Sequence, residues 1–491
     1  MPVTIKRQYD FSGGVNTTDL EGAPNEFGSC RNVRLFGRAL KERGGQTKLN
    51  GSAVQSGAAV HSLFRFYRDD GSTRYLIGFA GTRMLEMKAS PGNWESSPTS
   101  FTSGAKMDAA TMDNTFYFGN GTDGMKSTTA PGGALTAVSG APNANLITSV
   151  PSMNRLFASE PNSKRMSYTA LLDSADWTTA NDAGFFDVPF TEGENIKAHA
   201  AIPNGVLAIF SNSSFHTLSG TDPSNFVRRE VDPSIGCKAP RSIAAGRGGI
   251  YFLANNNRVY WTDGRPPVPV SRNIESYLDE GSTGDYVNSV GWVEGTRYHL
   301  AISVGGGNND VVLVKDWSST QNPQGGWTID DNIAVASVAV DDGLEGQVYT
   351  GDYSGFVQQQ DTGTTDNGTV VNSTISTFFD TYDEEERRKK TKRTYVKFEP
   401  LGGNPMTVAI AKDGGPLETV ASVSMASGAS ALDDTDYALD DTDTALDGGA
   451  SEKTQRVSII RNARSIKHCF SWTSPFVFYG YSTLMRKKFP K

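Results

Sequence analysis

The sequence predicts an all-β protein: a β-propeller of six or seven blades with a C-terminal β-sandwich-like domain. Apolar residues fall in short alternating runs, and long amphipathic stretches at helical spacing are scarce. Gly, Asn and Ser separate the runs, and paired runs recur about every 40 to 50 residues, the length of one four-stranded blade. A β-sandwich or an irregular β array would also show evenly spaced strands, but a steady period of loosely matched units favours the propeller.

The clearest unit is the stretch GGIYFLANNNRVYWTDG, residues 248–264. Two runs of alternating β-branched and aromatic residues, Gly249 to Ala254 and Arg258 to Thr262, flank three asparagines. Because Asn tolerates the positive φ that tight connections need, this pattern predicts a β-hairpin. A lone hairpin cannot bury its own apolar face in water, so neighbouring units must cover it.

Further stretches share this pattern of an alternating strand, a polar turn and a second alternating strand. They are residues 74–87, 114–127, 154–169, 205–220, 296–316 and 346–361. The segments between them carry shorter strand candidates, such as SVGWVEG and AVASVAVDD. In a propeller each blade buries both faces against its neighbours around a central axis, which is the cover that such hairpins require.

The period stops near Val370, and this predicts three regions. Residues 1–60 form an N-terminal segment that partly closes the propeller, 61–370 form the propeller, and 371–491 form a separate all-β domain. Within this last domain, strands are expected at 394–400, 405–412, 455–461 and 466–485, and an Asp-rich loop at 431–449.

Composition excludes several functional classes. The net charge of -8 and the pI of about 5.3 argue against a surface that wraps nucleic acid, although DNA could still slide through an acidic channel. Cys30, Cys237 and Cys469 are too few and too scattered for a disulfide framework or a zinc site, so a reducing compartment fits best. The start lacks the apolar core of a signal peptide, and no window is apolar enough for a membrane span. We therefore expect a soluble protein made in the cytosol.

No catalytic residue, cofactor or enzymatic activity is expected. The five histidines (His61, His199, His216, His299 and His468) lie far apart beside strand residues, which favours structural roles. Nucleophile elbows, phosphate loops and dinucleotide fingerprints are absent from the sequence. A glycosidase needs a carboxylate pair, which 54 acidic residues cannot exclude, but the S-x-D-x-G-x-x-W box of sialidase propellers is missing. The YWTD of residues 260–263 occurs once, where the propellers named for it repeat it in every blade.

Two charged segments stand out in the C-terminal region. The heptad-like repeat ALDDTDYALDDTDTALDGG is expected to be a solvated loop, because its like charges repel. It offers hard oxygens for Ca²⁺ at Asp434, Asp436, Asp441, Asp443 and Asp447, but no Gly sits where an EF-hand turn requires one, so no metal site is expected. In an oligomer, a ring of such loops would instead repel a polyanion. The basic run 387–393 abuts four acids and is expected to be a solvated, self-pairing surface segment.

Three features of the chain resemble the tail hub or nozzle proteins of short-tailed bacteriophages, also known as packaged-DNA stabilisation proteins. The first is the N-terminal stretch 9–45, in which an F-x-G-G segment precedes an asparagine, short strands and a Gly-Gly turn after a basic residue. The second is found in the middle of the chain, where the stretches 149–177, 194–221 and 248–261 follow one another in the same order as similar stretches of the hub proteins. The third is the closing stretch WTSPFVFYGYSTLMRKK. The Asp-rich heptads depart from the family pattern, and nothing is transferred to them.

The resemblance implies a structural role in the virion tail after synthesis in the host bacterial cytoplasm. Such proteins form a ring, usually of six copies, below the portal and its adaptor. The ring retains the packaged genome, passes double-stranded DNA through its lumen without sequence-specific binding, and seats fibres or a tail needle. A closed ring follows from a heterologous interface whose rotation closes.

Two alternatives remain open from the sequence. One is a tail-borne propeller that binds or degrades carbohydrate, which would require a pocket lined by aromatic platforms and two carboxylates. The other is the same fold in a long-tailed phage, as a connector or distal-tail protein. The position of the gene beside portal and adaptor genes would separate this second alternative from the nozzle.

Overall fold

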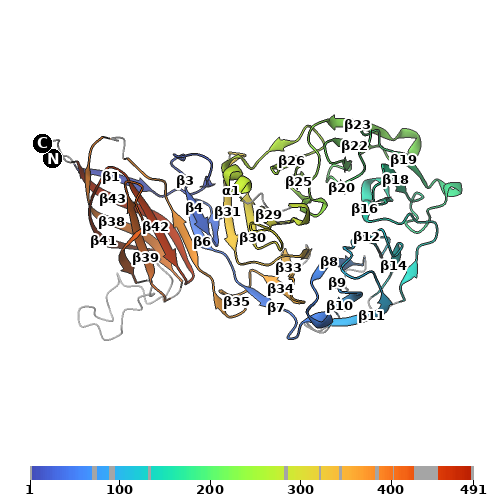
Figure 1. Ribbon diagram of the computed structural model, residues 1–491, viewed down its shortest axis with the longest axis horizontal. Coiled ribbons are helices and arrows are strands. Elements are labelled where there is room, and N and C mark those ends of the chain that lie inside the picture. The colour runs from blue at the N-terminus through green and yellow to red at the C-terminus, as the bar shows by residue number, and fades with distance from the viewer. Residues whose placement is uncertain are drawn as a thin grey trace, which may run out of the picture. The chain divides into compact units, whose positions relative to one another are not determined.

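Sheets arranged as blades around an axis make up most of the chain, and five of the seven are four-stranded and antiparallel (Figure 1). The computed structural model describes residues 3–68, 74–87, 94–130, 134–280, 286–319, 322–341, 346–381, 386–401, 403–424 and 452–487. It divides the chain into two units. We call Gln46–Lys315 with Asp331–Thr362 the propeller unit, and Met1–Gly45 with Asp316–Asp330 and Gly363–Lys491 the sandwich unit.

Seven blades follow one another in chain order among the described residues of the propeller unit. Blade 1 contains β8 (Val60–Tyr67), β9 (Arg74–Ala80), β10 (Arg83–Met87) and β11 (Trp94–Ser100). Blade 2 contains β12 (Asp108–Met112), β13 (Thr115–Gly119), β14 (Lys126–Thr128) and β15 (Thr136–Ala137). Blade 3 contains β16 (Leu146–Val150), β17 (Arg155–Ser159), β18 (Arg165–Tyr168) and β19 (Gly184–Asp187). Blades 4 and 5 contain β20 (Ala198–Ala201), β21 (Leu207–Phe210), β22 (Phe215–Ser219), β23 (Val227–Asp232); and β24 (Ala244–Gly246), β25 (Gly249–Leu253), β26 (Val259–Thr262), β27 (Val268–Pro269). Blades 6 and 7 contain β28 (Val290–Glu294), β29 (Arg297–Ile302), β30 (Val311–Asp316); and β32 (Ser337–Asp341), β33 (Gln347–Gly351), β34 (Val357–Gln360), β7 (Gln46–Lys48).

The predicted hairpins are confirmed as the second and third strands of the blades. In the stretch 248–264, β25 pairs with β26 in the register Ile250↔Thr262 to Leu253↔Val259, and Asn257 takes a φ of 60° in the turn. The other six predicted hairpins likewise coincide with neighbouring strands of one sheet, from β9 and β10 in blade 1 to β33 and β34 in blade 7. Of the shorter candidates, SVGWVEG contains β28 and AVASVAVDD contains β32, each the first strand of its blade.

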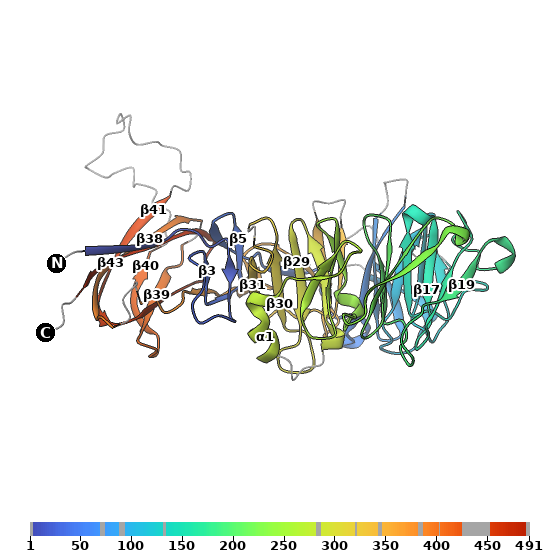
Figure 2. The ribbon, with the colours of Figure 1, turned by 90° about the horizontal axis from the view of Figure 1, so that it is seen from above.

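The first strand of each blade lies nearest the axis, and Figure 2 shows the blades from the side. Successive first strands contact one another between blades 1, 2, 3 and 4 and between blades 5, 6 and 7. The ring closes where β32 of blade 7 meets β8 of blade 1. Blade 7 takes its fourth strand from the other end of the unit, because β7 pairs with β34 in the register Lys48↔Gln358. This pairing ties the start of the propeller to its end.

Apolar clusters fill the seams between blades. Leu207 and Ile209 of blade 4 pack with Phe157 and Met166 of blade 3, and equivalent clusters join blades 1 to 2, 2 to 3, 4 to 5, 6 to 7 and 7 to 1. Between blades 5 and 6, the rings of Tyr251 and Tyr298 stack with centroids 4.9 Å apart. Each blade therefore buries both of its faces, as the two-sided apolar pattern of the hairpins requires.

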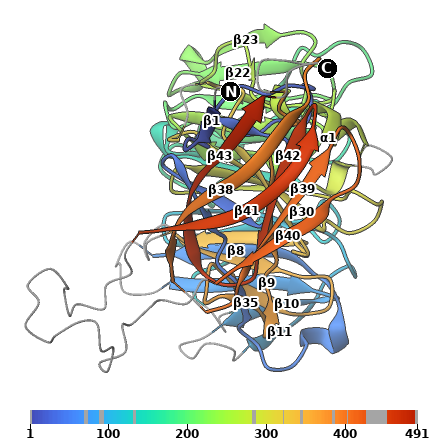
Figure 3. The ribbon, with the colours of Figure 1, turned by 90° about the vertical axis from the view of Figure 1, so that its left-hand side faces the viewer.

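The sandwich unit contains two sheets whose strands come from both ends of the chain (Figure 3). One has the order β41-β38-β43-β6-β5, with β1 also paired to β43, and the other has the order β4-β37-β42-β39-β40. These strands are β1 (Val3–Gln8), β4 (Ser29–Arg31), β5 (Val33–Phe36), β6 (Ala39–Glu42), β37 (Ser373–Ser376), β38 (Lys389–Pro400), β39 (Met406–Lys412), β40 (Glu418–Val423), β41 (Lys453–Ala463), β42 (Ile466–Trp472) and β43 (Phe476–Lys487).

Aromatic side chains pack between the two sheets of this unit. Phe470 and Trp472 of β42 contact Phe478 of β43, with centroids 5.0 and 6.3 Å apart, and His468 contacts Tyr481 at 4.7 Å. The range 466–485 contains two strands, because the chain turns between Trp472 and Phe476. Phe11 from the N-terminal segment joins this core, with its ring 5.5 Å from that of Phe478.

The N-terminal segment 1–60 serves both units. Its residues 46–48 complete blade 7 as β7, whereas β1, β4, β5 and β6 belong to the sheets of the sandwich unit. Short strands β2 (Gly14–Val15) and β3 (Glu26–Phe27) pair in parallel, and Gly14 also pairs with Trp327 of β31 (Trp327–Asp331).

Part of the basic run 387–393 is built into β38 and is not solvated. Lys389 is only 1% exposed, and its ammonium group donates to the carbonyl oxygens of Thr381 and, at 3.1 Å, Arg464. The expectation of a solvated surface run is therefore wrong for Lys389, whose charge is satisfied by backbone oxygens. The Asp-rich stretch 431–449 lies outside the described residues. In the part of the chain that is described, no helix has the length and apolar character to cross a bilayer.

Candidate functional site

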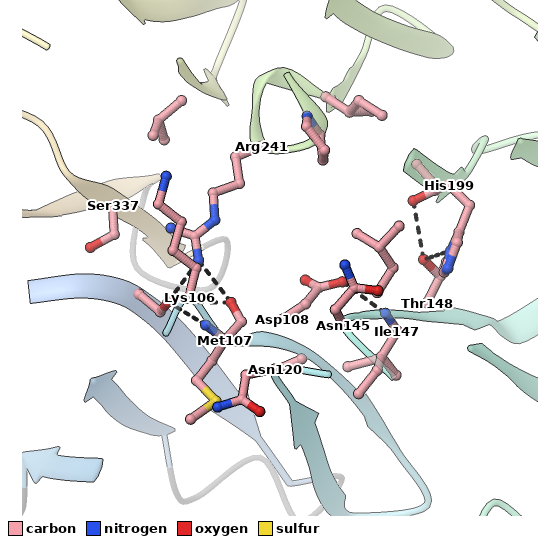
Figure 4. Close-up of a pocket in the computed structure, with 18 of the residues that line it drawn as sticks. Lys106, Met107, Asp108, Asn120, Asn145, Ile147, Thr148, His199, Arg241 and Ser337 are labelled. Carbon is pink, nitrogen blue, oxygen red and sulfur yellow. Dashed lines mark hydrogen bonds between the residues drawn. The ribbon is translucent and has the colours of Figure 1, made fainter. Parts of the chain in front are cut away.

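A cavity of about 900 Å³, lined about equally by polar and apolar groups, lies at one end of the propeller channel. Its wall is built where the first strands of the blades begin, as Asp108 of β12, Leu146 of β16 and Ser337 of β32 illustrate. Turns between second and third strands reach the same end, and they supply Asn120 and Asn162. Figure 4 shows labelled side chains from several blades around a common space. The cavity thus gathers residues that are far apart in the sequence.

Arg241 bridges the channel at the cavity wall. It lies on η5 (Pro240–Ser242), which precedes β24 of blade 5, and its guanidinium donates to residues of blade 1 and of the segment entering blade 2. One Nη donates to the His61 carbonyl oxygen, and the other donates to Ser62 Oγ at 2.7 Å and to the Met107 carbonyl oxygen at 2.8 Å. In a seven-bladed ring blade 5 lies opposite blades 1 and 2, so this side chain spans the axis.

Lys106 and Asp108 flank this bridge. Lys106 donates to Asn288 Oδ1, and partial desolvation together with repulsion from Arg241 lowers the pKa of its ammonium group to about 8. Asp108 accepts a hydrogen bond from the Ile147 amide at 2.8 Å, and burial raises the pKa of its carboxyl group to about 6. Two cations and one carboxyl group with a raised pKa therefore lie at this side of the cavity.

His199 and Asn145 form another polar part of the wall. His199 Nδ1 lies 2.7 Å from Thr148 Oγ1, which fixes the ring, while His199 Nε2 has no hydrogen-bond partner. Burial lowers the pKa of His199 to about 4, so the ring is neutral near pH 7. The buried Oδ1 of Asn145 also lacks a partner. A polar atom buried without a partner is costly, so both groups lower the stability of this part of the wall.

The five histidines are all buried, and the structure brings only part of the set to this cavity. His199 lines it, and the backbone carbonyl oxygen of His61 accepts a hydrogen bond from Arg241, which also lines it. His216 packs edge-on against Phe190, His299 stacks on Trp292, and His468 lies in the sandwich core. Sequence reasoning did not single out Lys106, Asn145 or Arg241, because they lie in connecting segments with no motif.

The described residues contain no group of three or more His, Cys, Asp or Glu side chains placed to hold a metal ion. The calcium candidates Asp434, Asp436, Asp441, Asp443 and Asp447 lie outside the described residues. Cys30, Cys237 and Cys469 are unpaired and buried. Burial raises the pKa of the Cys30 and Cys237 thiols to about 12, which makes them unreactive as thiolates at neutral pH.

The titrating groups of the cavity have opposite effects on stability. His199 stays neutral down to a pKa of about 4, below its ordinary 6.5, so the unfolded chain binds more protons than the folded one between these values and stability falls as the pH falls. Asp108 has a raised pKa of about 6 against an ordinary 3.8, so it adds stability as the pH falls through that value.

When the pH is lowered from about 7 to about 4.5, we expect the melting temperature of His199→Gln to decrease by less than that of the unaltered chain. The melting temperature of Asp108→Asn should decrease by more. Gln can keep a hydrogen bond to Thr148, and Asn can keep the bond from the Ile147 amide. Calorimetry of the propeller transition at both pH values measures the difference. Shifts of the same sign in the two variants would contradict the assignment.

No family model and no curated protein matches the chain. Among solved structures, the chain is similar to virginiamycin B lyase from Staphylococcus aureus, with 10% identity, a TM-score of 0.44 and coverage of 64% of this chain and 97% of that one. It is also similar to the Neurospora crassa Pan2 WD40 domain, with 9% identity, a TM-score of 0.41 and coverage of 67% and 99%. A third similar structure is YCF48 bound to D1 peptide, with 10% identity, a TM-score of 0.41 and coverage of 68% of this chain and 99% of that one. One of these proteins is named as a lyase, and at these identities and TM-scores no ligand or activity is transferred to this chain.

Proposed function

We propose that this chain is a non-enzymatic structural component of a bacteriophage tail, a nozzle or hub protein that forms a ring. The ring retains the packaged genome, passes double-stranded DNA during ejection, and offers surfaces for the portal adaptor and for fibres or a needle. The proposal rests on the resemblance to such proteins of the N-terminal stretch 9–45, the middle stretches 149–177, 194–221 and 248–261, and the closing stretch 472–488, and on the structural roles of residues in the two terminal stretches.

One observation carries most weight: the two terminal segments that show the resemblance belong to the same domain. β6, within 9–45, pairs with β43 of the closing stretch in the register Leu40↔Phe478. Phe11 of the F-x-G-G segment is fully buried in the same aromatic core. Two separately recognised features thus form one folding unit, which supports treating them as a single family signature.

The Gly-Gly turn of the N-terminal segment also has a structural reason. Arg43, which precedes it, is 2% exposed and donates to both carboxylate oxygens of Asp366, at 2.9 and 2.5 Å. A Cβ on Gly45 would lie 2.1 Å from the Thr365 carbonyl oxygen. The residues that carry the resemblance are therefore those that hold backbone segments together, as a structural protein requires.

DNA would pass through the lumen between copies and not through a single propeller. Arg241 spans the channel of the propeller from blade 5 to blade 1, and Lys106 reaches Asn288 next to it. Glycosidase chemistry does not fit this cavity, because Asp108 is the one carboxylate among its described lining residues. Retaining and inverting glycosidases both use a pair.

Particles of the phage that encodes this chain test the proposal. An amber codon in its gene removes the chain from the particles. We then expect capsids that fill but lose their DNA, and tails that end at the adaptor. Nuclease-resistant DNA per particle and averaged electron micrographs measure the two effects, and expression of the chain in trans is the control that restores both. Amber particles that keep their DNA and a complete tail would refute the role.

A further inference from the structure

One face of the six-stranded sheet of the sandwich unit gathers positive charge from four strands. In this sheet β41, β38, β43 and β1 lie side by side (Figure 3). Residues directly opposite each other in paired strands project from the same face. One such row runs across the sheet from Arg7 through Ser482 and Tyr395 to Arg456. The two arginines are exposed, so the row faces solvent.

Two further rows on this face add more cations. Leu484 and Arg486 share the face of Ser482, because side chains alternate along β43. Leu484 pairs with Arg393, and Arg486 pairs with Lys390. Residues between the rows, such as Thr394 and Met485, are buried on the side of the partner sheet. We call the set Arg7, Lys390, Arg393, Arg456 and Arg486 the basic face.

The cations of the basic face have no acidic partner among the described residues, whereas cations next to them do. Lys6, on the other side of β1, pairs with Asp380 at 2.9 Å, and Lys397, at one end of the same face, pairs with Glu452 at 2.6 Å. Like charges directly opposite each other in a sheet destabilise it, as Lys390 and Arg486 must. An anion laid over the face would remove this repulsion.

The net charge of the chain does not describe this surface. The Asp-rich stretch 431–449 contains seven aspartates and neither Lys nor Arg, so it supplies most of the net charge of -8. The basic face is therefore a local surface of opposite sign, which attracts a polyanion.

The chemistry of the basic face favours the backbone of a nucleic acid. Stable interfaces between proteins have an apolar core from which charged residues are depleted, whereas here cations lie in every row. A small anion binds in a concave site, and an open sheet surface does not enclose one. Duplex DNA carries one charge per ~1.7 Å of its axis, so several of its phosphates can contact the cations at once.

We propose that the basic face binds the phosphate backbone of double-stranded DNA without reading its sequence. This inference rests on the proposed function, which brings the packaged genome to this chain, and it assigns the contact to the sandwich unit. Its test uses only purified chain and DNA. It can therefore fail while the particle experiment succeeds, and the reverse.

Fluorescence anisotropy of a labelled duplex of about 30 base pairs, titrated with the full chain between about 50 and 200 mM salt, measures the contact. Five phosphate contacts predict a slope of about -4.5 for the logarithm of the association constant against the logarithm of the salt concentration. Two duplexes of unrelated sequence should give the same affinity within about twofold, because phosphate contacts carry no sequence information.

Paired substitutions locate the contact. Arg393→Gln with Arg456→Gln should weaken binding at least about tenfold at about 100 mM salt and reduce the steepness of the slope by about two. Arg393→Lys with Arg456→Lys keeps both charges and should restore the slope. The matched control is Lys164→Gln with Arg265→Gln, which removes the same charge from exposed positions of the propeller unit.

Four results would each overturn the proposal. The first is no binding of the duplex at about 50 mM salt. The second is equal slopes for the two glutamine pairs, which would place the DNA elsewhere. The third is displacement of the duplex by poly-L-glutamate of equal charge as readily as by unlabelled duplex, which would indicate an acidic protein as the partner. The fourth is weaker binding by a variant that lacks 431–449, since losing seven carboxylates that precede β41 should leave binding equal or tighter.

Discussion

Asp341→Ala is expected to lower the free energy of unfolding of the propeller unit by about 3–5 kcal/mol. Asp341 ends β32 of blade 7, and its side chain is fully buried. It accepts from the guanidinium of Arg65 on β8 of blade 1, which is 7% exposed, and from the Tyr67 hydroxyl at 3.2 Å. The substitution leaves the Arg65 cation buried without its counter-charge, at the seam where the ring closes. Urea unfolding, with hydrogen exchange at the amides of β8 and β32, measures the loss.

Two further variants separate the buried charge from other effects. Asp187 makes a comparable ion pair with Arg165 on the rim of blade 3, but both side chains are about half exposed, and Asp187→Ala should cost no more than about 1 kcal/mol. The double variant Asp341→Leu with Arg65→Met removes both charges and should recover much of the loss, since no unpaired ion remains. Equal losses for Asp341→Ala and Asp187→Ala would show that the seam does not depend on this pair.

The blades could be predicted from the sequence because their second and third strands have apolar residues on both faces. β25, for example, is buried at every position from Gly249 to Leu253. The first strands face the channel on one side and lack this signal, as the half-buried DAATM of β12 shows. The fourth strands vary in length, from two residues in β15 and β27 to seven in β11, so they give no regular signal. Spacing of hairpins therefore reveals a propeller, although the number of blades emerges only from the sheets.

Partners of the N-terminal strands could not be predicted in the same way. β4 pairs with β37 in the register Cys30↔Ile375, and β7 pairs with β34, in each case across several hundred residues of chain. Alternation in a strand indicates which face is buried but not which strand lies beside it. The same holds for the cavity. Lys106 and Arg241 lie in segments between blades, and only the curvature of the ring brings them together.

Gly14→Ala is expected to destabilise the sandwich unit by about 3 kcal/mol or more, from two additive causes. Gly14 has a φ of +74°, a left-handed conformation that costs a non-glycine residue about 1–2 kcal/mol. In addition, a Cβ at this position would lie 2.6 Å from both the backbone nitrogen and the backbone oxygen of Trp327. Trp327 is fully buried and Gly14 pairs with it, so its backbone cannot withdraw without breaking that pairing.

Gly37→Ala is the matched control, because it shares the first cause and lacks the second. Gly37 has a φ of +60° in the turn between β5 and β6, and nothing lies within 4 Å of a Cβ built there. Its cost should be about 1 kcal/mol, and the difference between the two variants measures the close approach of the F-x-G-G backbone to Trp327. Urea midpoints of the sandwich transition, with hydrogen exchange at β31, provide the measurement. If the two substitutions cost the same, the second glycine of that motif serves the turn alone, and the N-terminal signature loses its structural reason.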